Sequence, residues 1–220
     1  MKTFGLKDEK IIKIVNKIRT KYGFRNVETS HDVRHGDEVF KNMLELREHE
    51  FFNNFDFNIV GLAVMAYAHD MYADEDRANH HELAFKKILK RKPKFLKNLP
   101  GQVFKNVCLA IRQHRASIVN INTENQYVNI MRLADKGKPN ISNIIKRAYL
   151  YSKEKNKNAS NKTCVRLTLM HLLEKYSQDG YAFKNDVIYS KIYKTDIEKV
   201  FKQIDDMSIN YLIKITLYLN

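Results

Sequence analysis

The chain contains one strongly apolar stretch, Ile59–Ala68, that runs directly into the pair His69-Asp70. An uninterrupted apolar run of about ten residues predicts a helix buried on all sides. It is too short to span a bilayer. A carboxylate at the end of a core helix is costly unless it is paired or binds a metal ion. His69 and Asp70 therefore need partners from other parts of the chain.

Four further His or Asp residues lie on the apolar faces of predicted helices. His35 opens the apolar stripe of a helix over 31–47, and His114 ends the stripe of a helix over 102–115. His80 begins the helix that follows a polar loop at 71–79, and Asp135 closes a helix over 126–135. Mixed imidazole and carboxylate ligands suit Mn, Fe, Co, Ni or Zn. The pattern predicts a site for a divalent transition metal.

The spacing of apolar residues predicts an all-α fold. Gly and Pro are scarce, with 7 and 3 residues, which disfavours a sheet with many tight turns. The segment 151–162 lacks large apolar residues except for Tyr151 at its start, and predicts a linker or exposed loop. We expect a catalytic domain at 1–150. The C-terminal extension at 163–220 should form helices over 165–176, 195–207 and 210–219 that pack on this core.

Composition indicates the compartment and the classes of partner. The two cysteines are not in paired or metal-type spacing, and the N-terminus has no apolar signal core, so we expect a cytoplasmic protein without membrane contact. The net charge of +14 favours either a nucleic-acid partner or a Lys-rich composition that leaves a solvated basic surface. The densest cluster of lysines is at 86–97.

The ordered set of His and Asp residues resembles the HD-domain metal-dependent phosphohydrolases over roughly residues 27–146. The matching motifs are RHGDEV with His35, AYAHDMY with His69 and Asp70, HHELAFKKIL with His80, AIRQHRASI with His114, and RLADKGKP with Asp135. The resemblance implies an HD-domain helical bundle. It also implies hydrolysis of a phosphoester or phosphoanhydride bond, in a nucleotide or another small phosphorylated substrate, by a metal-activated water.

The resemblance implies roles for these residues. His35, His69, Asp70 and Asp135 suffice for one ion. His80 and His114 match the family members that hold two, so we expect two ions, with Mg as an alternative to the transition metals. His69 and Asp70 would be catalytic, and Asp70 would bridge the ions and orient the water. His80 and His81 compete for one ligand role, and Ala84, four residues after His80, favours His80.

Several residues near the motifs could bind the substrate. Lys136 and Lys138 closely follow Asp135, and Arg115 follows His114, so these cations could contact phosphate groups. His31 lies one turn before His35 and could face the substrate, as could His81. Each of these residues could equally belong to an ordinary polar surface.

Two other functions remain open from the sequence. A few relatives on this fold use a di-iron centre for oxygen chemistry, which metal identity and oxygen consumption would distinguish. A nucleic-acid-processing or binding module would explain the charge and would show salt-dependent binding. The C-terminal helices could cover the site or form a homodimer interface.

Overall fold

A computed structural model describes residues 2–24, 32–118, 120–184, 187–207, 213, 214 and 217. Helices are the only regular secondary structure in these residues, so the all-α prediction is confirmed. The chain divides into two compact units, Met1–Gly137 and Lys138–Asn220. None of the described helices is both long enough and apolar enough to cross a membrane.

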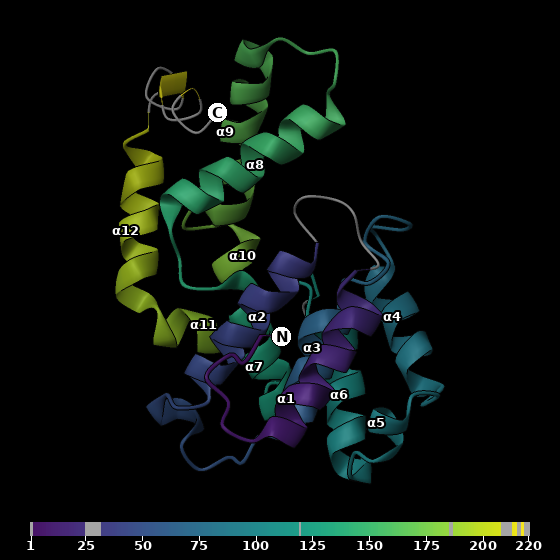
Figure 1. The fold of residues 1–220 in the computed structure, drawn as a ribbon. Helices are drawn as coiled ribbons and strands as arrows, with labels where there is room; N and C mark the ends of the chain where they lie inside the picture. The colour runs from purple at the N-terminus through teal and green to yellow at the C-terminus, as the bar shows by residue number, and fades with distance from the viewer. Residues whose placement is uncertain are drawn as a thin grey trace. The chain divides into compact units, whose positions relative to one another are not determined.

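In the part of the first unit that the structure describes, there are seven α-helices and two short helices of other types (Figure 1). These are α1 (Glu9–Ile18), η1 (Arg19–Gly23, a π-helix), α2 (Val33–Leu46), η2 (Glu50–Phe52, a 3-10 helix), α3 (Ile59–Ala68), α4 (His80–Leu89), α5 (Lys94–Lys97), α6 (Gly101–Gln113) and α7 (Gln126–Lys136).

Helix α3 is the core of the first unit. Every residue from Gly61 to Ala68 is buried, because α1, α2, α6 and α7 all pack against this helix. Its N-terminus is capped by Asn58, whose side chain accepts a hydrogen bond from the Gly61 amide at 3.0 Å. The Asn58 amide donates to the Tyr127 hydroxyl at 3.0 Å, which fixes the start of α3 against α7.

Helix α2 approaches α3 closely at a glycine. A Cβ atom on Gly36 would lie 2.7 Å from Cδ1 of Tyr67 and 3.3 Å from the Ala66 carbonyl oxygen. The absence of a side chain at Gly36 therefore lets the two helices approach, and His35 lies directly beside this contact. The ring centroids of His35 and His69 are 5.3 Å apart as a result.

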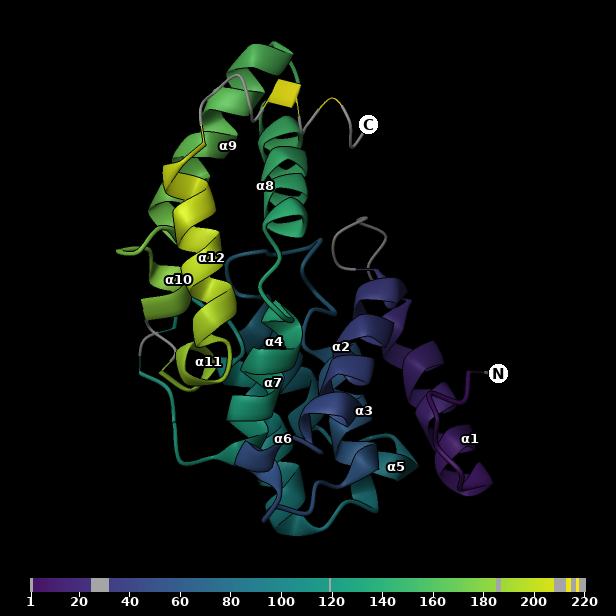
Figure 2. The same ribbon diagram turned by 90° about the vertical axis from the view of Figure 1, so that its left-hand side faces the viewer.

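The second unit is built from α8 (Ile141–Lys155), α9 (Asn161–Tyr176), α10 (Tyr181–Lys184), α11 (Val187–Ile192) and α12 (Lys194–Asp205) (Figure 2). Helices α8 and α9 pack together, and α12 packs on α9. Their shared core contains six buried residues: Ile145, Ala148, Tyr149, Cys164, Val165 and Leu172. Both cysteines of the chain are buried and unbridged.

The sequence-based domain boundary at residue 150 falls inside α8 and needs correction. The structure divides the chain between Gly137 and Lys138, and most of the predicted linker at 151–162 belongs to the ends of α8 and α9. Residues 151–155 continue α8, and Ser152 is buried there between the two helices. Its hydroxyl donates to the Ala148 carbonyl at 2.9 Å and accepts from Thr168 at 3.3 Å.

Three short helices, α5, α10 and α11, lie in segments for which no helix was predicted. The helix expected over 210–219 falls mostly outside the described residues. The packing of the C-terminal helices on the core stays a prediction.

Candidate metal centre

The six predicted ligands meet inside the first unit, although they come from five separate segments. They form two groups, each able to hold a metal ion: His35, His69, Asp70 and Asp135, and then Asp70, His80 and His114. All lie at or near helix ends. Asp70 belongs to both groups, so the His-Asp pair after α3 is the centre of the cluster.

The two oxygens of the Asp70 carboxylate face different histidines. Oδ2 lies 3.1 Å from Nε2 of His69 and 3.6 Å from Nε2 of His35. Oδ1 lies 3.0 Å from Nε2 of His80 and 3.4 Å from Nε2 of His114. One carboxylate thus connects two sets of imidazole nitrogens, as a bridging ligand would.

Asp135, from the last turn of α7, completes the first group. Its Oδ1 lies 3.1 Å from Nε2 of His35 and 3.6 Å from Nε2 of His69. The Asp135 side chain is 21% exposed, whereas those of His80 and His114 are 6% and 3% exposed. The first group is therefore the one closer to solvent.

Backbone carbonyls orient three of the imidazole rings. Nδ1 of His69 lies 3.1 Å from the Ala66 oxygen, Nδ1 of His80 lies 2.9 Å from the Arg77 oxygen, and Nδ1 of His114 lies 2.8 Å from the Ile111 oxygen. A carbonyl only accepts, so each Nδ1 carries the proton. The Nε2 lone pairs then face the cluster. Histidines that bind metals are held in the same way, with the second nitrogen donating to a carbonyl or carboxylate.

The donor set fits a cation. Nε2 of His80 and Nε2 of His114 lie 3.1 Å apart, yet with Nδ1 protonated both atoms are acceptors. Nε2 of His69 is buried and has no hydrogen-bond partner among the described residues. Buried lone pairs repel one another and a nearby carboxylate. A positive charge placed between these groups removes the repulsion. A metal ion or a proton can supply this charge.

The pKa values show how the metal-free cluster holds protons. Burial opposes a charge on His69, but Asp70 and Asp135 outweigh this effect and raise the pKa of His69 to about 10. Burial would raise the pKa of Asp135, yet a hydrogen bond from His35 and the positive charge on His69 outweigh burial and hold this pKa well below its usual value. Burial lowers the pKa of His114. The first group therefore retains a proton that a metal ion would displace.

The structure distinguishes His80 from His81. Nε2 of His80 lies 3.0 Å from the Asp70 carboxylate. The His81 ring packs beside the other two imidazoles, with its centroid 5.8 Å from that of His80 and 6.4 Å from that of His114. Neither metal-type group found in the described residues includes His81. Burial is the main cause that lowers the pKa of His81 to about 4, so its ring is neutral at pH 7.

The predicted substrate-binding cations have varied surroundings. Arg115 donates from Nη1 to the Ala78 carbonyl and so fastens the loop before α4. Lys136 is the last residue of α7, directly after Asp135, and is partly exposed. Lys138 belongs to the second unit, where its ammonium lies 3.4 Å from the Asp196 carboxylate. His31 lies outside the described residues.

A partly buried ionic network, absent from the sequence-based prediction, holds the helices that carry His35 and His69. Asp37 of α2 accepts hydrogen bonds from Nε of Arg19 at 2.6 Å, from the Tyr67 hydroxyl at 2.9 Å and from Nζ of Lys2 at 2.5 Å. Asp37 is two residues after His35, and Tyr67 is two residues before His69. The sequence signal for this network was Asp37 itself, an acidic residue two positions after the predicted ligand His35.

Two further side chains hold the segments around His114 and Asp135. Nη1 of Arg132, a buried residue of α7, donates to the carbonyls of Gln113 at 2.9 Å and Arg115 at 2.6 Å. Nδ2 of Asn42 in α2 donates to the Ala134 carbonyl at 2.9 Å. The sequence signal for the contacts of Arg132 was its position among the apolar residues of α7.

Comparisons with family models, curated proteins and solved structures find no match to the chain. The His and Asp cluster is therefore the feature of the chain that indicates a function.

Proposed function

We propose that the first unit is an HD-type metal-dependent phosphohydrolase, which cleaves a phosphoester or phosphoanhydride bond in a small phosphorylated substrate such as a nucleotide. One observation carries the proposal: the two oxygens of Asp70 face separate pairs of histidine Nε2 atoms. The order of the ligands along the chain supports it, because it is the order that the HD-domain resemblance implies.

We assign the ligands to two ions. His35, His69, Asp70 Oδ2 and Asp135 would hold the first, and Asp70 Oδ1, His80 and His114 would hold the second. The donors suit Mn, Fe, Co, Ni or Zn, and are less typical of Mg because four of the six are imidazoles. Three protein ligands on the second ion would leave coordination positions for water or substrate.

When bound, such ions lower the pKa of coordinated water to near neutrality and polarise a phosphoryl oxygen. The chain provides the conditions for this chemistry. Asp70 is buried, and its two oxygens are positioned between four imidazoles, so its negative charge is fixed in one orientation. The partly exposed Asp135 marks the side from which a substrate can reach the cluster.

A screen of nucleotides and phosphate esters, with protein loaded with each candidate metal, tests the proposal. We expect hydrolysis that chelation abolishes. Asp70→Ala should reduce the rate by more than about 100-fold, the upper range for loss of a residue that only supports a ligand. Asp56→Ala, which removes an exposed carboxylate outside both groups, is the matched control and should retain full activity.

Full activity in Asp70→Ala would contradict the proposal. Oxygen consumption by the iron-loaded protein without phosphate release would replace it with a di-iron oxygenase, since the same donors can hold two iron ions.

A further inference from the structure

The positive charge of the first unit is concentrated in one segment. Residues 83–123 contain ten Lys and Arg residues and no Asp or Glu, whereas residues 1–82 contain twelve Lys and Arg against fifteen Asp and Glu. A Lys-rich composition alone would spread the excess over the unit. The segment corresponds to most of α4, all of α5 and α6, and the loop that follows His114.

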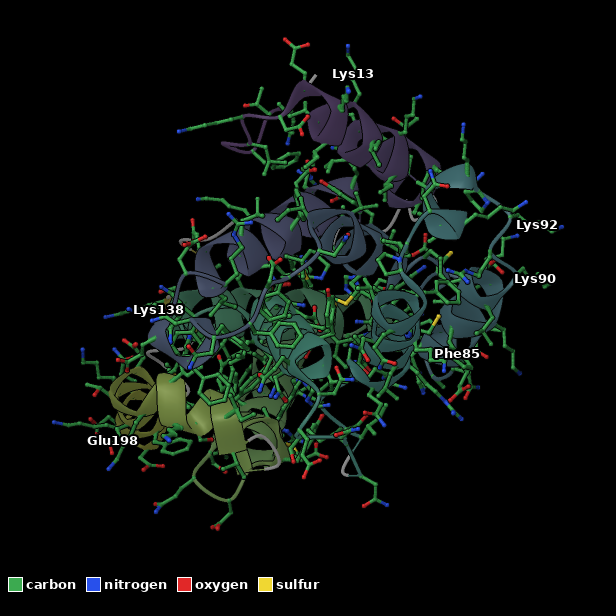
Figure 3. The ribbon with its side chains drawn as sticks, turned by 90° about the horizontal axis from the view of Figure 1, so that it is seen from below. Lys13, Phe85, Lys90, Lys92, Lys138 and Glu198 are labelled. Carbon is green, nitrogen blue, oxygen red and sulfur yellow. The ribbon has the colours of Figure 1, made fainter. Side chains whose placement is uncertain are left out.

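Six of the seven lysines of this segment lie within residues 86–97 and form an exposed surface, which we call the α4–α5 basic surface. It consists of six exposed side chains: Lys86, Lys87, Lys90, Lys92, Lys94 and Lys97. Figure 3 shows Lys90 and Lys92 extending outward on the same side of the first unit, away from Lys13 of α1.

The turn within this surface is fixed by Arg91. Its Nη2 donates to the carbonyls of Leu96 at 3.2 Å and Leu99 at 3.1 Å, and its guanidinium lies 3.9 Å from the centre of the Phe104 ring. Arg91 therefore serves the fold, and it holds the neighbouring lysines on a rigid support. A backbone that is already ordered before binding loses less entropy when the segment binds a polyanion.

A stripe of aromatic and apolar side chains runs along α4 from the metal centre into the basic surface. His81, Phe85 and Leu89 follow one another at four-residue spacing, so they lie on one face of the helix. His81 lies beside His80 and His114, Phe85 is partly exposed, and Leu89 is 47% exposed. The stripe thus connects the cluster with the lysines.

Phe85 lies among cations. The guanidinium of Arg112 is 5.2 Å from its ring centre, and Nε of Arg112 lies 2.6 Å from the Glu82 carboxylate. Glu82 is the one acidic residue of α4, so Arg112 offsets the only negative charge on the helix. An aromatic ring beside exposed lysines is the combination that binds single-stranded nucleic acids, through stacked bases and paired phosphates.

We propose that the α4–α5 basic surface binds single-stranded nucleic acid, with phosphates on its lysines and a base stacked on Phe85. The bound strand follows the stripe along α4 and directs one end toward the metal centre. This binding does not require hydrolysis, so it can be tested independently of the proposed reaction.

Fluorescence anisotropy with labelled oligothymidylate of about 16 nucleotides, within the usual site sizes, tests the proposal. The full chain is used in EDTA, so that neither metal bridging nor hydrolysis contributes. We expect binding at low salt, with a log–log salt slope of about −0.7 for each phosphate neutralised. No binding at low salt would overturn the proposal, whether or not the protein hydrolyses nucleotides.

Two triple variants of equal net charge locate the surface. The variant with Lys86→Gln, Lys90→Gln and Lys92→Gln should bind at least about tenfold more weakly, with a salt slope less steep by about 2. The variant with Lys7→Gln, Lys10→Gln and Lys17→Gln changes exposed lysines at and before α1 and should bind like the parent protein. Equal losses in both variants would show that net charge alone drives binding and would overturn the assignment to this surface.

Phe85→Leu tests the stacking contact, because it keeps an apolar side chain on α4. We expect roughly tenfold weaker binding to the single strand, with the salt slope unchanged. Unchanged affinity in Phe85→Leu, or equal affinity of the parent protein for a duplex of the same length, would exclude base stacking and overturn the assignment to a single strand.

Discussion

Asp37 connects four parts of the first unit around a single carboxylate. It accepts hydrogen bonds from Lys2, from Arg19 in η1 and from Tyr67 in α3, while lying on α2 itself. Burial alone would raise the pKa of Asp37, but the hydrogen bonds from Arg19, Lys2 and Tyr67 outweigh it and hold the pKa below its usual value. The ionised carboxylate is therefore the form that stabilises the fold.

Asp37→Asn should lower the free energy of unfolding at pH 7 by about 2–3 kcal/mol. This is less than the loss for a fully buried pair, because the Lys2 side chain is half exposed. The contribution of Asp37 is complete above the unfolded pKa of about 3.9 and is lost as pH falls through the lower folded pKa. Urea unfolding at several pH values should show the difference between parent and variant narrowing below about pH 4. A constant difference down to about pH 3 would contradict this role.

At the scale of single helices, apolar periodicity predicted the elements that carry the ligands. Helices predicted over 31–47 and 102–115 are found as Val33–Leu46 and Gly101–Gln113, because each buries a continuous stripe. The short helices α5, α10 and α11 have too few turns to show a period, and such helices depend on tertiary contacts. The prediction of a linker or exposed loop over 151–162 did not include the end of α8, because composition does not reveal that Ser152 is buried.

The membership of the cluster could be predicted, but its geometry could not. Order and apolar context identified His35, His69, Asp70, His114 and Asp135. Which oxygen of Asp70 faces which imidazole depends on how α2, α6 and α7 pack around α3 and on how α4 packs on α6. A single sequence does not specify those contacts. The supports at Arg132 and Asn42 were missed for the same reason, since they join residues far apart in the chain.

The close contact of α2 with α3 can be tested at Gly36. Gly36→Ala should destabilise the protein by about 1–3 kcal/mol, because the new Cβ would collide with Tyr67, whose hydroxyl is held by Asp37. It should also weaken metal binding by displacing His35. Thermal unfolding and metal titration measure both effects.

Gly101→Ala is the matched control for Gly36→Ala. Gly101 begins α6, and a Cβ atom added there would meet nothing within 4 Å, so alanine should be neutral or stabilise by up to about 1 kcal/mol. Equal stability of Gly36→Ala and the parent protein would show that α2 can move away from α3 without cost.

At the scale of the whole molecule, all six cluster residues and the supports Asp37, Asn42 and Arg132 belong to the first unit. A fragment of residues 1–140 should therefore fold and bind metal with the affinity of the full chain. Circular dichroism and metal titration test this expectation. A fragment that is helical but lacks metal affinity would show that the second unit contributes to the site.

If Asp70 is shared by two metal sites, the protein should bind two metal ions, and metal analysis counts them. Parent protein loaded with excess Mn, Fe, Co or Ni and then desalted should retain two equivalents. His80→Ala and His114→Ala should each retain about one, His35→Ala should lose the other ion, and His171→Ala, outside both groups, should match the parent. One equivalent in the parent, unchanged in His80→Ala and His114→Ala, would contradict the two-metal site, and no retained metal would contradict the metal centre altogether.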